Sequence, residues 1–265
     1  MPDITINTLN EMKRQGEKIA VLTSYDASFT RLMEAAGVEV ILVGDSLGMV
    51  IQGQESTLPV AVSEMVYHTQ CVARVRQQAF LIADMPFMSY SSTAQALENA
   101  GRLMKEGGAH MVKLEGGATQ LDTVSGLTAN GIPVCAHLGL LPQSVHRLGG
   151  YRVQGKDDDS ARIMREDALS LQEAGAQMLV LECVPRELAA DITRELDIPV
   201  IGIGAGSDTD GQVLVLYDML GITLDKLPKF CRNFMLQTDT VLQALESYVR
   251  AIKDGSYPSV DESYK

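Results

Sequence analysis

The sequence predicts a single (βα)8 barrel, an α/β fold in which eight parallel strands alternate with helices. Apolar runs of strand length alternate with amphipathic segments of helix length along the 265 residues, which is typical of a parallel sheet buried on both faces. The length agrees, because one such barrel takes about 250 residues. Four of the runs end in a carboxylate, and a barrel would bring these strand ends together on one face. The carboxylates are Asp45, Asp84, Glu115 and Glu182.

Short runs rich in Val, Ile and Leu mark the expected strands. They cover residues 18–24, 38–44, 79–84, 110–116, 132–138, 177–183, 198–204 and 211–217. Helices are expected between them, at residues 27–37, 63–78, 93–108, 119–131, 160–175 and 186–196. Several of these helices end on a glycine, as a helix C-cap does, for example at Gly37 and Gly175.

The later part of the chain departs from this regular pattern. Only Ala205 to Asp210 separate the last two strands, so the seventh helix is reduced to a turn or the seventh strand is misplaced. One or two helices are expected over 229–254, and the tail over 255–265 is expected to be loose or docked on a neighbouring subunit.

No linker divides residues 1–265, which indicates one domain. A doubly wound open sheet is the competing fold, but acids on strands two, three, four and six fit a ring better.

Composition excludes several classes of partner. Acidic residues outnumber Lys plus Arg by 34 to 22, and the resulting charge of −12 argues against binding to nucleic acid or to an anionic membrane. No apolar run approaches the ~20 residues that a membrane span needs, and the first residues do not resemble a signal peptide. The four cysteines are widely spaced and form no CxxC pattern. We therefore expect a cytoplasmic protein with reduced thiols.

Asp45 and Asp84 follow adjacent strands of the predicted barrel. Taken singly, each side chain could simply cap the turn that follows it. Together they make a suitable pair of oxygen ligands for Mg²⁺, which takes one or two carboxylates with waters and substrate oxygens.

Lys113 and Glu115 are two residues apart on one strand, so both side chains point to the same face. A lysine inside a barrel is costly unless it is paired or functional. A structural ion pair of Lys113 with Asp84 or Glu115 is one interpretation. A cation for a substrate carboxylate, with Glu115 supporting the metal, is the other, and both can hold at once.

His137 and Glu182 end the fifth and sixth strands. His137 is either a hydrogen-bonded core residue or part of the site. Glu182 follows four apolar residues, and burial there should raise its pKa above the usual ~4.3 and make it a better general base. The alternative is a buried acid paired with Lys113. A glycine-rich stretch at 202–207 lacks the spacing of a nucleotide loop and is only weak evidence for phosphate binding.

These segments together resemble the ketopantoate hydroxymethyltransferase family. The similar stretches run in the family's order from about residue 20 to 235 and include VGDSLGM, ADMPFMSY, MVKLEGG, PVCAHLGLLPQS, GGYRVQGK and LVLECVP. The resemblance implies a barrel of the phosphoenolpyruvate/pyruvate type. It also implies transfer of a one-carbon unit from 5,10-methylenetetrahydrofolate to 3-methyl-2-oxobutanoate, in pantothenate biosynthesis, by a homo-oligomer that is often a decamer.

The resemblance also implies roles for individual residues. Asp45 and Asp84 would hold Mg²⁺, and Glu115 would reach it directly or through water. Ser46 and Lys113 would contact the keto acid. We also expect Asp45, Asp84 and His137 to take part in binding it. Glu182 would be the base that removes a proton from the keto acid.

Four residues depart from the family pattern, and none is a metal or base position. They are Ser24, Ala136, Leu141 and Tyr217. Ala136 and Leu141 could alter the side of the site that binds folate, so the affinity for the donor is the least secure expectation. The long segment 140–159 is a candidate lid.

Two alternative functions are a metal-dependent aldolase or lyase that uses a free aldehyde, and a non-catalytic scaffold barrel.

Overall fold

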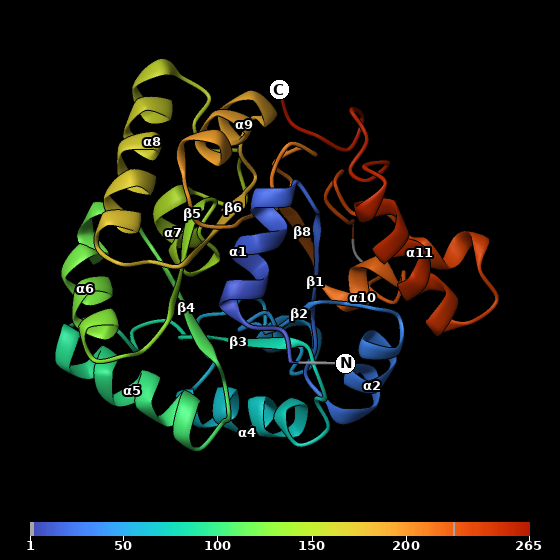
Figure 1. The fold of residues 1–265 in the computed structure, drawn as a ribbon, viewed down its shortest axis with the longest axis horizontal. Coiled ribbons are helices and arrows are strands. Elements are labelled where there is room, and N and C mark those ends of the chain that lie inside the picture. Colours follow the sequence, from blue (N-terminus) through green and yellow to red (C-terminus); the bar gives the residue numbers. More distant parts are fainter. Residues whose placement is uncertain (1–2, 225) are drawn as a thin grey trace.

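The chain forms a closed barrel of eight parallel strands (Figure 1). A computed structural model describes residues 3–224 and 226–265. Each strand pairs with its neighbours in the chain, and β8 closes the ring by pairing with β1. The strands are β1 (Ile19–Thr23), β2 (Val40–Val43), β3 (Phe80–Asp84), β4 (Met111–Glu115), β5 (Val134–Gly139), β6 (Met178–Glu182), β7 (Val200–Ile203) and β8 (Gly211–Leu214). The predicted barrel is confirmed, with strand ends that differ by a few residues.

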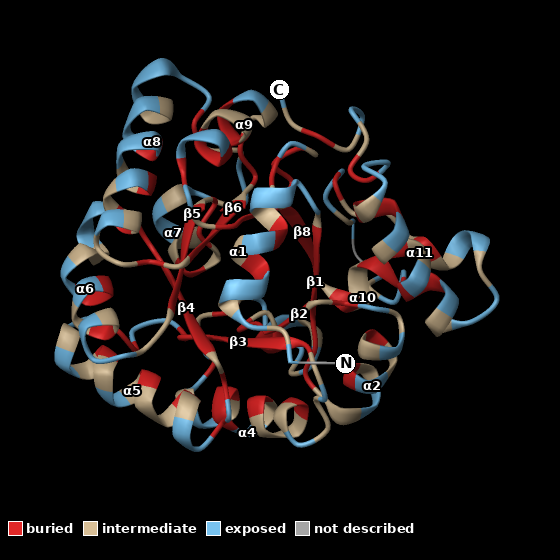
Figure 2. Ribbon diagram, in the orientation of Figure 1, coloured by how far each residue is buried: buried red, intermediate tan, exposed pale blue. Residues whose placement is uncertain are grey.

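Helices cover the outside of the ring, with their buried residues toward the strands (Figure 2). The α-helices of the described residues, including α1 at the end of the barrel, are α1 (Ile6–Gln15), α2 (Ala27–Ala35), α3 (Leu47–Val50), α4 (Val62–Ala73), α5 (Thr93–Lys105), α6 (Leu121–Ala129), α7 (Val145–Leu148), α8 (Asp158–Glu173), α9 (Arg186–Glu195), α10 (Leu216–Met219) and α11 (Val241–Lys253). Asp26 and Ser92 begin α2 and α5, since each side chain accepts a hydrogen bond from the first turn. None of the helices in the described part of the chain has the length and apolar character of a membrane span.

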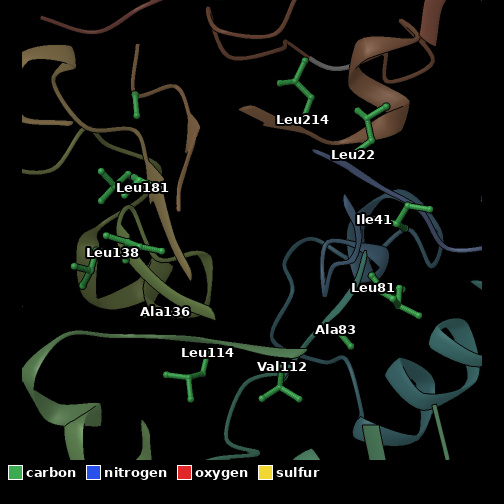
Figure 3. Close-up of a cluster of buried hydrophobic side chains, with 14 of the residues drawn as sticks. Leu22, Ile41, Leu81, Ala83, Val112, Leu114, Ala136, Leu138, Leu181 and Leu214 are labelled. Carbon is green, nitrogen blue, oxygen red and sulfur yellow. The ribbon is translucent and has the colours of Figure 1, made fainter. Parts of the chain in front are cut away.

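The apolar core has two layers, because successive strand residues point to opposite faces. One layer lies between the strands and the helices (Figure 3) and includes Leu22, Ile41, Leu81, Val112, Leu114 and Leu181. The other fills the barrel and includes Val21, Leu42, Ile82, Met111, Cys135 and Val180. On four strands the inward positions change from apolar to polar near the carboxyl end. The next inward residue, two positions along the strand, is Asp84 after Ile82, Lys113 after Met111, His137 after Cys135 and Glu182 after Val180.

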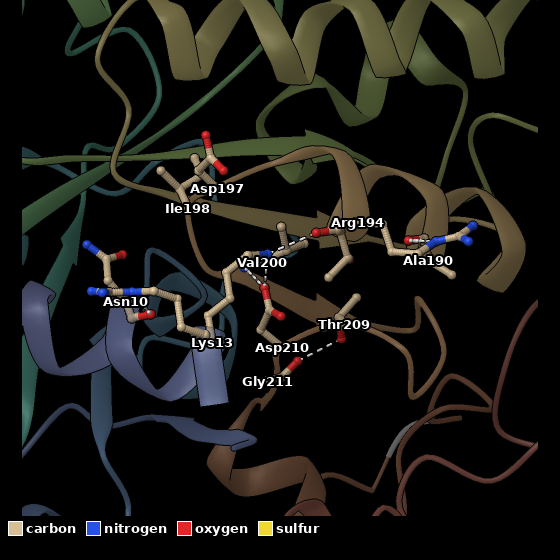
Figure 4. A network of polar contacts seen from close by, with 12 residues as sticks. Asn10, Lys13, Ala190, Arg194, Asp197, Ile198, Val200, Thr209, Asp210 and Gly211 are labelled. Carbon is tan, nitrogen blue, oxygen red and sulfur yellow. Dashed lines mark hydrogen bonds and ion pairs between the residues drawn. The ribbon is translucent and has the colours of Figure 1, made fainter. Parts of the chain in front are cut away.

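Helix α1, which the sequence analysis did not predict, closes the amino-terminal end of the barrel. It crosses the centre of the ring in Figure 1, and its buried Leu9 and Met12 belong to the cluster inside the barrel. The Lys13 ammonium lies 2.7 Å from Asp210 Oδ2. The same carboxylate oxygen accepts a hydrogen bond from Val200 N at 2.8 Å (Figure 4). One carboxylate therefore ties α1 to the last two strands.

The seventh crossover and the tail differ in how well they were predicted. The connection from β7 to β8 contains turns and no helix in the described residues, as its length predicted. The tail is not loose, because it lies against its own chain, and its docking on a neighbouring subunit stays a prediction. Arg186 N donates to Tyr264 O at 3.0 Å, and Arg232 pairs with Glu262 at 2.6 Å.

Replacing Asp210 by alanine should lower the free energy of unfolding by about 3 kcal/mol, because it leaves the Lys13 ammonium without its partner. The two side chains are only 13% and 14% exposed, so solvent compensates little. Urea unfolding at fixed protein concentration measures the change. Asp191→Ala breaks an exposed pair with Arg194 and should cost less than about 1 kcal/mol. Equal losses in the two variants would contradict the role of Asp210.

Candidate active site

Lys113 and Asp84 form a buried ion pair at the carboxyl end of the barrel. They are register partners on β4 and β3, and Lys113 Nζ lies 2.9 Å from Asp84 Oδ1. Burial alone would lower the pKa of Lys113, but the carboxylates of Asp84, Glu115 and Asp45 outweigh it and raise that pKa. The lysine therefore stays charged, and its structural pairing with Asp84 is compatible with a role toward a substrate.

Asp45 lies beside Asp84 and does not cap the helix that follows it. Its backbone N–H donates to Asp84 Oδ2 at 3.0 Å, and its own Oδ2 accepts from Gln143 Nε2 at 2.8 Å. The short helix α3 has no side-chain cap. Burial and the neighbouring Asp84 raise the pKa of Asp45 to about 7. A cation at this place would relieve the repulsion between the two carboxylates.

His137 lies between Glu115 and Glu182. Its Nδ1 is 3.4 Å from Lys113 Nζ and 3.7 Å from Glu115 Oε1, and its Nε2 is 3.3 Å from Glu182 Oε2. Burial and the Lys113 charge lower the pKa of His137 well below its usual value, so the ring is neutral. Because Nδ1 faces an ammonium, we assign the ring proton to Nε2. Nε2 has no hydrogen-bond partner among the described residues, and Glu182 Oε2 is a close polar neighbour rather than an acceptor.

Glu182 is the most accessible of the four acids, with 16% of its side chain exposed. Burial raises its pKa to about 8, against the lowering effect of Lys113. The next residue, Cys183, has a left-handed backbone with φ of 48°, so the chain turns sharply after the carboxylate. The close partner of Glu182 is His137 rather than Lys113. A weakly acidic carboxyl group next to an imidazole N–H is suited to accept a proton near neutral pH.

Ser46 lies at the edge of the cluster, where its Oγ is 2.8 Å from Tyr25 OH. The preceding glycine is needed there, since a Cβ on Gly44 would come within 2.7 Å of Ser46 Oγ. The hydroxyl is thus held near the carboxylates at the end of β2.

Gln143 and Tyr90 are site residues that the sequence analysis missed. Gln143 donates through its backbone N–H to Glu115 Oε2 at 3.0 Å, and through Nε2 to Asp45 and to Met85 O. Tyr90 donates its hydroxyl hydrogen to Gln143 Oε1. Gln143 therefore fixes two carboxylates that come from different strands. The stretch LLPQS contains it, but an uncharged amide gives no pattern that marks it as part of a site.

The arrangement of possible metal ligands is less compact than predicted. Within residues 3–224 and 226–265, no group of three His, Cys, Asp or Glu side chains is placed to hold a metal ion. Asp45 and Asp84 are adjacent, whereas Glu115 is bonded to Gln143, which also contacts Asp45. The two adjacent carboxylates fit the number that Mg²⁺ commonly takes from a protein.

Comparisons with known proteins place the chain in a family. A model of the ketopantoate hydroxymethyltransferase family matches residues 3–260. The chain belongs to this family. The 3-methyl-2-oxobutanoate hydroxymethyltransferases of Nitrosococcus oceani and Marinobacter nauticus are 62% and 55% identical to it, over 100% and 99% of both chains. The predicted family, and with it an enzyme of the transferase class, is confirmed.

Solved structures confirm the fold class. Phosphonopyruvate hydrolase, solved in complex with oxalate and Mg²⁺, is 13% identical with a TM-score of 0.62, over 98% of this chain and 93% of that one. 2,3-Dimethylmalate lyase, a member of the PEP mutase/isocitrate lyase superfamily, is 15% identical with a TM-score of 0.59, over 83% and 84%. At these identities the likeness concerns the barrel alone.

Glu182→Gln should reduce the loss of stability between pH 5 and pH 8. Because the pKa of Glu182 is raised to about 8 on folding, the protonated carboxyl stabilises the fold fully below the unfolded value of ~4.5. That stabilisation is lost as the pH rises through 8. Glutamine does not titrate, so the variant should lose about 2 kcal/mol less than the unchanged protein, a figure already reduced for partial exposure. Urea unfolding in EDTA at both pH values measures this, and equal losses would contradict the raised pKa.

Proposed function

We propose that this family member transfers a hydroxymethyl group from 5,10-methylenetetrahydrofolate to 3-methyl-2-oxobutanoate, giving 2-dehydropantoate (ketopantoate) in the first step of pantothenate biosynthesis. The observation that carries the proposal is the grouping of Glu182, His137 and Lys113 at one end of the barrel. A base with a raised pKa lies beside a neutral imidazole and near a fixed positive charge. Enolisation of a 2-oxo acid needs this combination.

The metal in the proposal is Mg²⁺, held by Asp45 and Asp84, with Glu115 acting through Gln143 or water. The donor set fits, since it consists of carboxylate oxygens, and the pKa of Asp45 indicates repulsion that a cation would relieve. When bound, Mg²⁺ would act as a Lewis acid toward the carboxylate and keto oxygens of the substrate, which lowers the energy of the enolate.

The side chains have distinct parts in the proposed reaction. Ser46 and Lys113 bind the keto acid, and the Lys113 ammonium stabilises the oxygen on which negative charge develops. Glu182 removes the C3 proton, and the His137 ring, whose Nε2 lies 3.3 Å from Glu182 Oε2, packs beside the carboxylate and helps to position it. The enolate carbon then bonds to the folate-borne methylene as one of its two C–N bonds breaks, and that nitrogen takes up the proton removed from C3. Water then replaces the second folate nitrogen on the methylene. It supplies the hydroxyl oxygen of the product and a proton to that nitrogen, so tetrahydrofolate leaves.

Segment 140–159 remains the proposed lid over this site. Within it, the exposed Tyr151 directs its hydroxyl to Met49 Sδ at 3.8 Å, and Gln154 N donates to Cys183 O at 3.0 Å. It therefore connects the ends of two strands across the mouth of the barrel. Closure would exclude water from the enolate.

Exchange of the C3 proton of 3-methyl-2-oxobutanoate for deuterium, followed by NMR, tests the proposed function. The unchanged enzyme with Mg²⁺ and no folate should catalyse exchange, and EDTA or Glu182→Gln should reduce the rate by at least 10²-fold. Adding 5,10-methylenetetrahydrofolate should then yield ketopantoate. Exchange without product would favour an aldolase that uses a free aldehyde. No exchange with folate present would remove these acids from the reaction.

Gln143→Leu should weaken Mg²⁺ binding by about 10- to 100-fold, because a residue that orients a metal ligand commonly has an effect of this size. The variant removes the amide that holds Asp45. Titration calorimetry with MgCl₂ measures the affinity in the absence of substrate. Gln154→Leu, in the same segment but bonded to Arg152 O, is the matched control. Equal affinity in the two variants would show that Gln143 does not orient the metal site.

The assembly and location also belong to the proposal. We infer a homo-oligomer, with a decamer as the form that the family resemblance implies, and a cytoplasmic enzyme. Sedimentation equilibrium of the full chain measures the oligomeric state.

A further inference from the structure

We propose that a cavity beside the carboxylate cluster binds the flat ring system of the one-carbon donor, a reduced folate. This inference rests on the proposed function, which names the donor but not the place where it binds. The cavity has a volume of about 300 Å³ and lies between the segments that follow β3, β4 and β5. These segments lie at the carboxyl end of the barrel, where barrel enzymes bind their substrates.

The cavity adjoins the carboxylate cluster. Glu115 and Gln143, both buried members of the site, form part of its wall. Gln143 also donates to Asp45 Oδ2, one of the groups at the proposed keto-acid position, which does not line the cavity. A molecule in the cavity would thus adjoin the keto acid without occupying its place, as a second substrate must.

Apolar side chains give the cavity a surface for a flat ring. Phe87 and Met88 line it while remaining 42% and 58% exposed, and Leu141 lines it from the segment after β5. Met88 has a left-handed backbone with φ of 61°, which is uncommon for a residue with a side chain. The volume is at the low end for pockets that bind small molecules, ~300–1,000 Å³. A bicyclic ring would fit, and the rest of the donor would lie outside.

Gln120 supplies a polar group whose hydrogen-bonding capacity is not used within the described chain. Its Oε1 is buried and has no hydrogen-bond partner among the described residues, although such an atom normally has one. Gly116 allows the close approach of this side chain, since a Cβ there would come within 2.9 Å of Gln120 Cγ. This oxygen has almost no accessible surface where it lies, so the N–H groups of a reduced pterin ring would satisfy it once the Gln120 side chain, which lines the cavity, rotates toward the ligand.

Arg147 is placed to bind the acidic part of the donor. It is an exposed residue that lines the cavity, and it forms no ion pair with any residue in the described ranges. A guanidinium binds carboxylates through paired hydrogen bonds. The glutamate end of a folate, extending from the cavity, would supply them.

Two substitutions test the cavity in the full-length enzyme. Gln120→Leu removes the buried acceptor at similar size, and Arg147→Ala removes an exposed charge with little risk to folding. Each should raise the KM for 5,10-methylenetetrahydrofolate about tenfold, as expected for the loss of one polar contact. Each should weaken tetrahydrofolate binding in titration calorimetry by the same factor. Arg74→Ala, which removes an exposed arginine on the outer surface of the barrel, is the control and should change neither quantity.

The folate-free C3 exchange separates this inference from the proposed function. Variants that retain the exchange rate of the unchanged enzyme but bind tetrahydrofolate tenfold more weakly support the cavity as the donor site. Variants that bind tetrahydrofolate and use the donor as the unchanged enzyme does would overturn it. If the unchanged enzyme itself shows no exchange, the proposed function fails, and the calorimetric comparison of Gln120→Leu with Arg74→Ala still decides whether the cavity binds a folate.

Discussion

The buried ammonium of Lys113 is the interaction on which the site depends. Four carboxylates meet at the end of the barrel, and without a cation their mutual repulsion would favour their neutral forms. Lys113 lies 2.9 Å from Asp84 and 3.4 Å from His137 Nδ1. Because the ammonium faces Nδ1, the histidine proton is directed to Nε2, on the side of the ring nearer Glu182. One cation therefore keeps Asp84 paired and also determines which tautomer of His137 lies beside the proposed base.

The two ends of the barrel have separate physical tasks. At the amino-terminal end, α1 buries Leu9 and Met12 in the interior and is tied to the strands through Asp210. At the carboxyl end, the inward-facing positions of the strands hold charged groups that raise or lower one another's pKa values. Such a cluster is costly by itself. The apolar layers below it and the helices around it supply the stability that lets it persist, so variants at the two ends should affect different properties.

The fold could be predicted from the sequence because strand length, alternation and terminal carboxylates all pointed to one architecture. Asp45, Asp84 and His137 come together, as their positions at the strand ends implied. The four apolar residues before Glu182 indicated a buried carboxyl with a raised pKa, and the structure agrees. Helix α1 was missed, since the short amphipathic pattern before the first strand belongs to no βα unit. The position of Gln143 could not be predicted either. That position depends on how the irregular segment after β5 folds back toward the ends of β2 and β4, and no local sequence pattern predicts such a contact. The tail was misread for the same reason, since its polar composition conceals the contacts of Arg232 and Tyr264 with their own chain.

The negative charge of the whole protein makes the placement of its positive groups informative. If a chain with a net charge of −12 acts on the two anionic substrates proposed for it, it must offer each of them a local cation, because the general field around it opposes their approach. Lys113 supplies one inside the barrel, where it is too deeply buried to meet more than the small keto acid. Arg147 supplies one at the rim, where a longer molecule can reach it from the cavity. The distance of each cation from solvent thus matches the size of the substrate proposed for it.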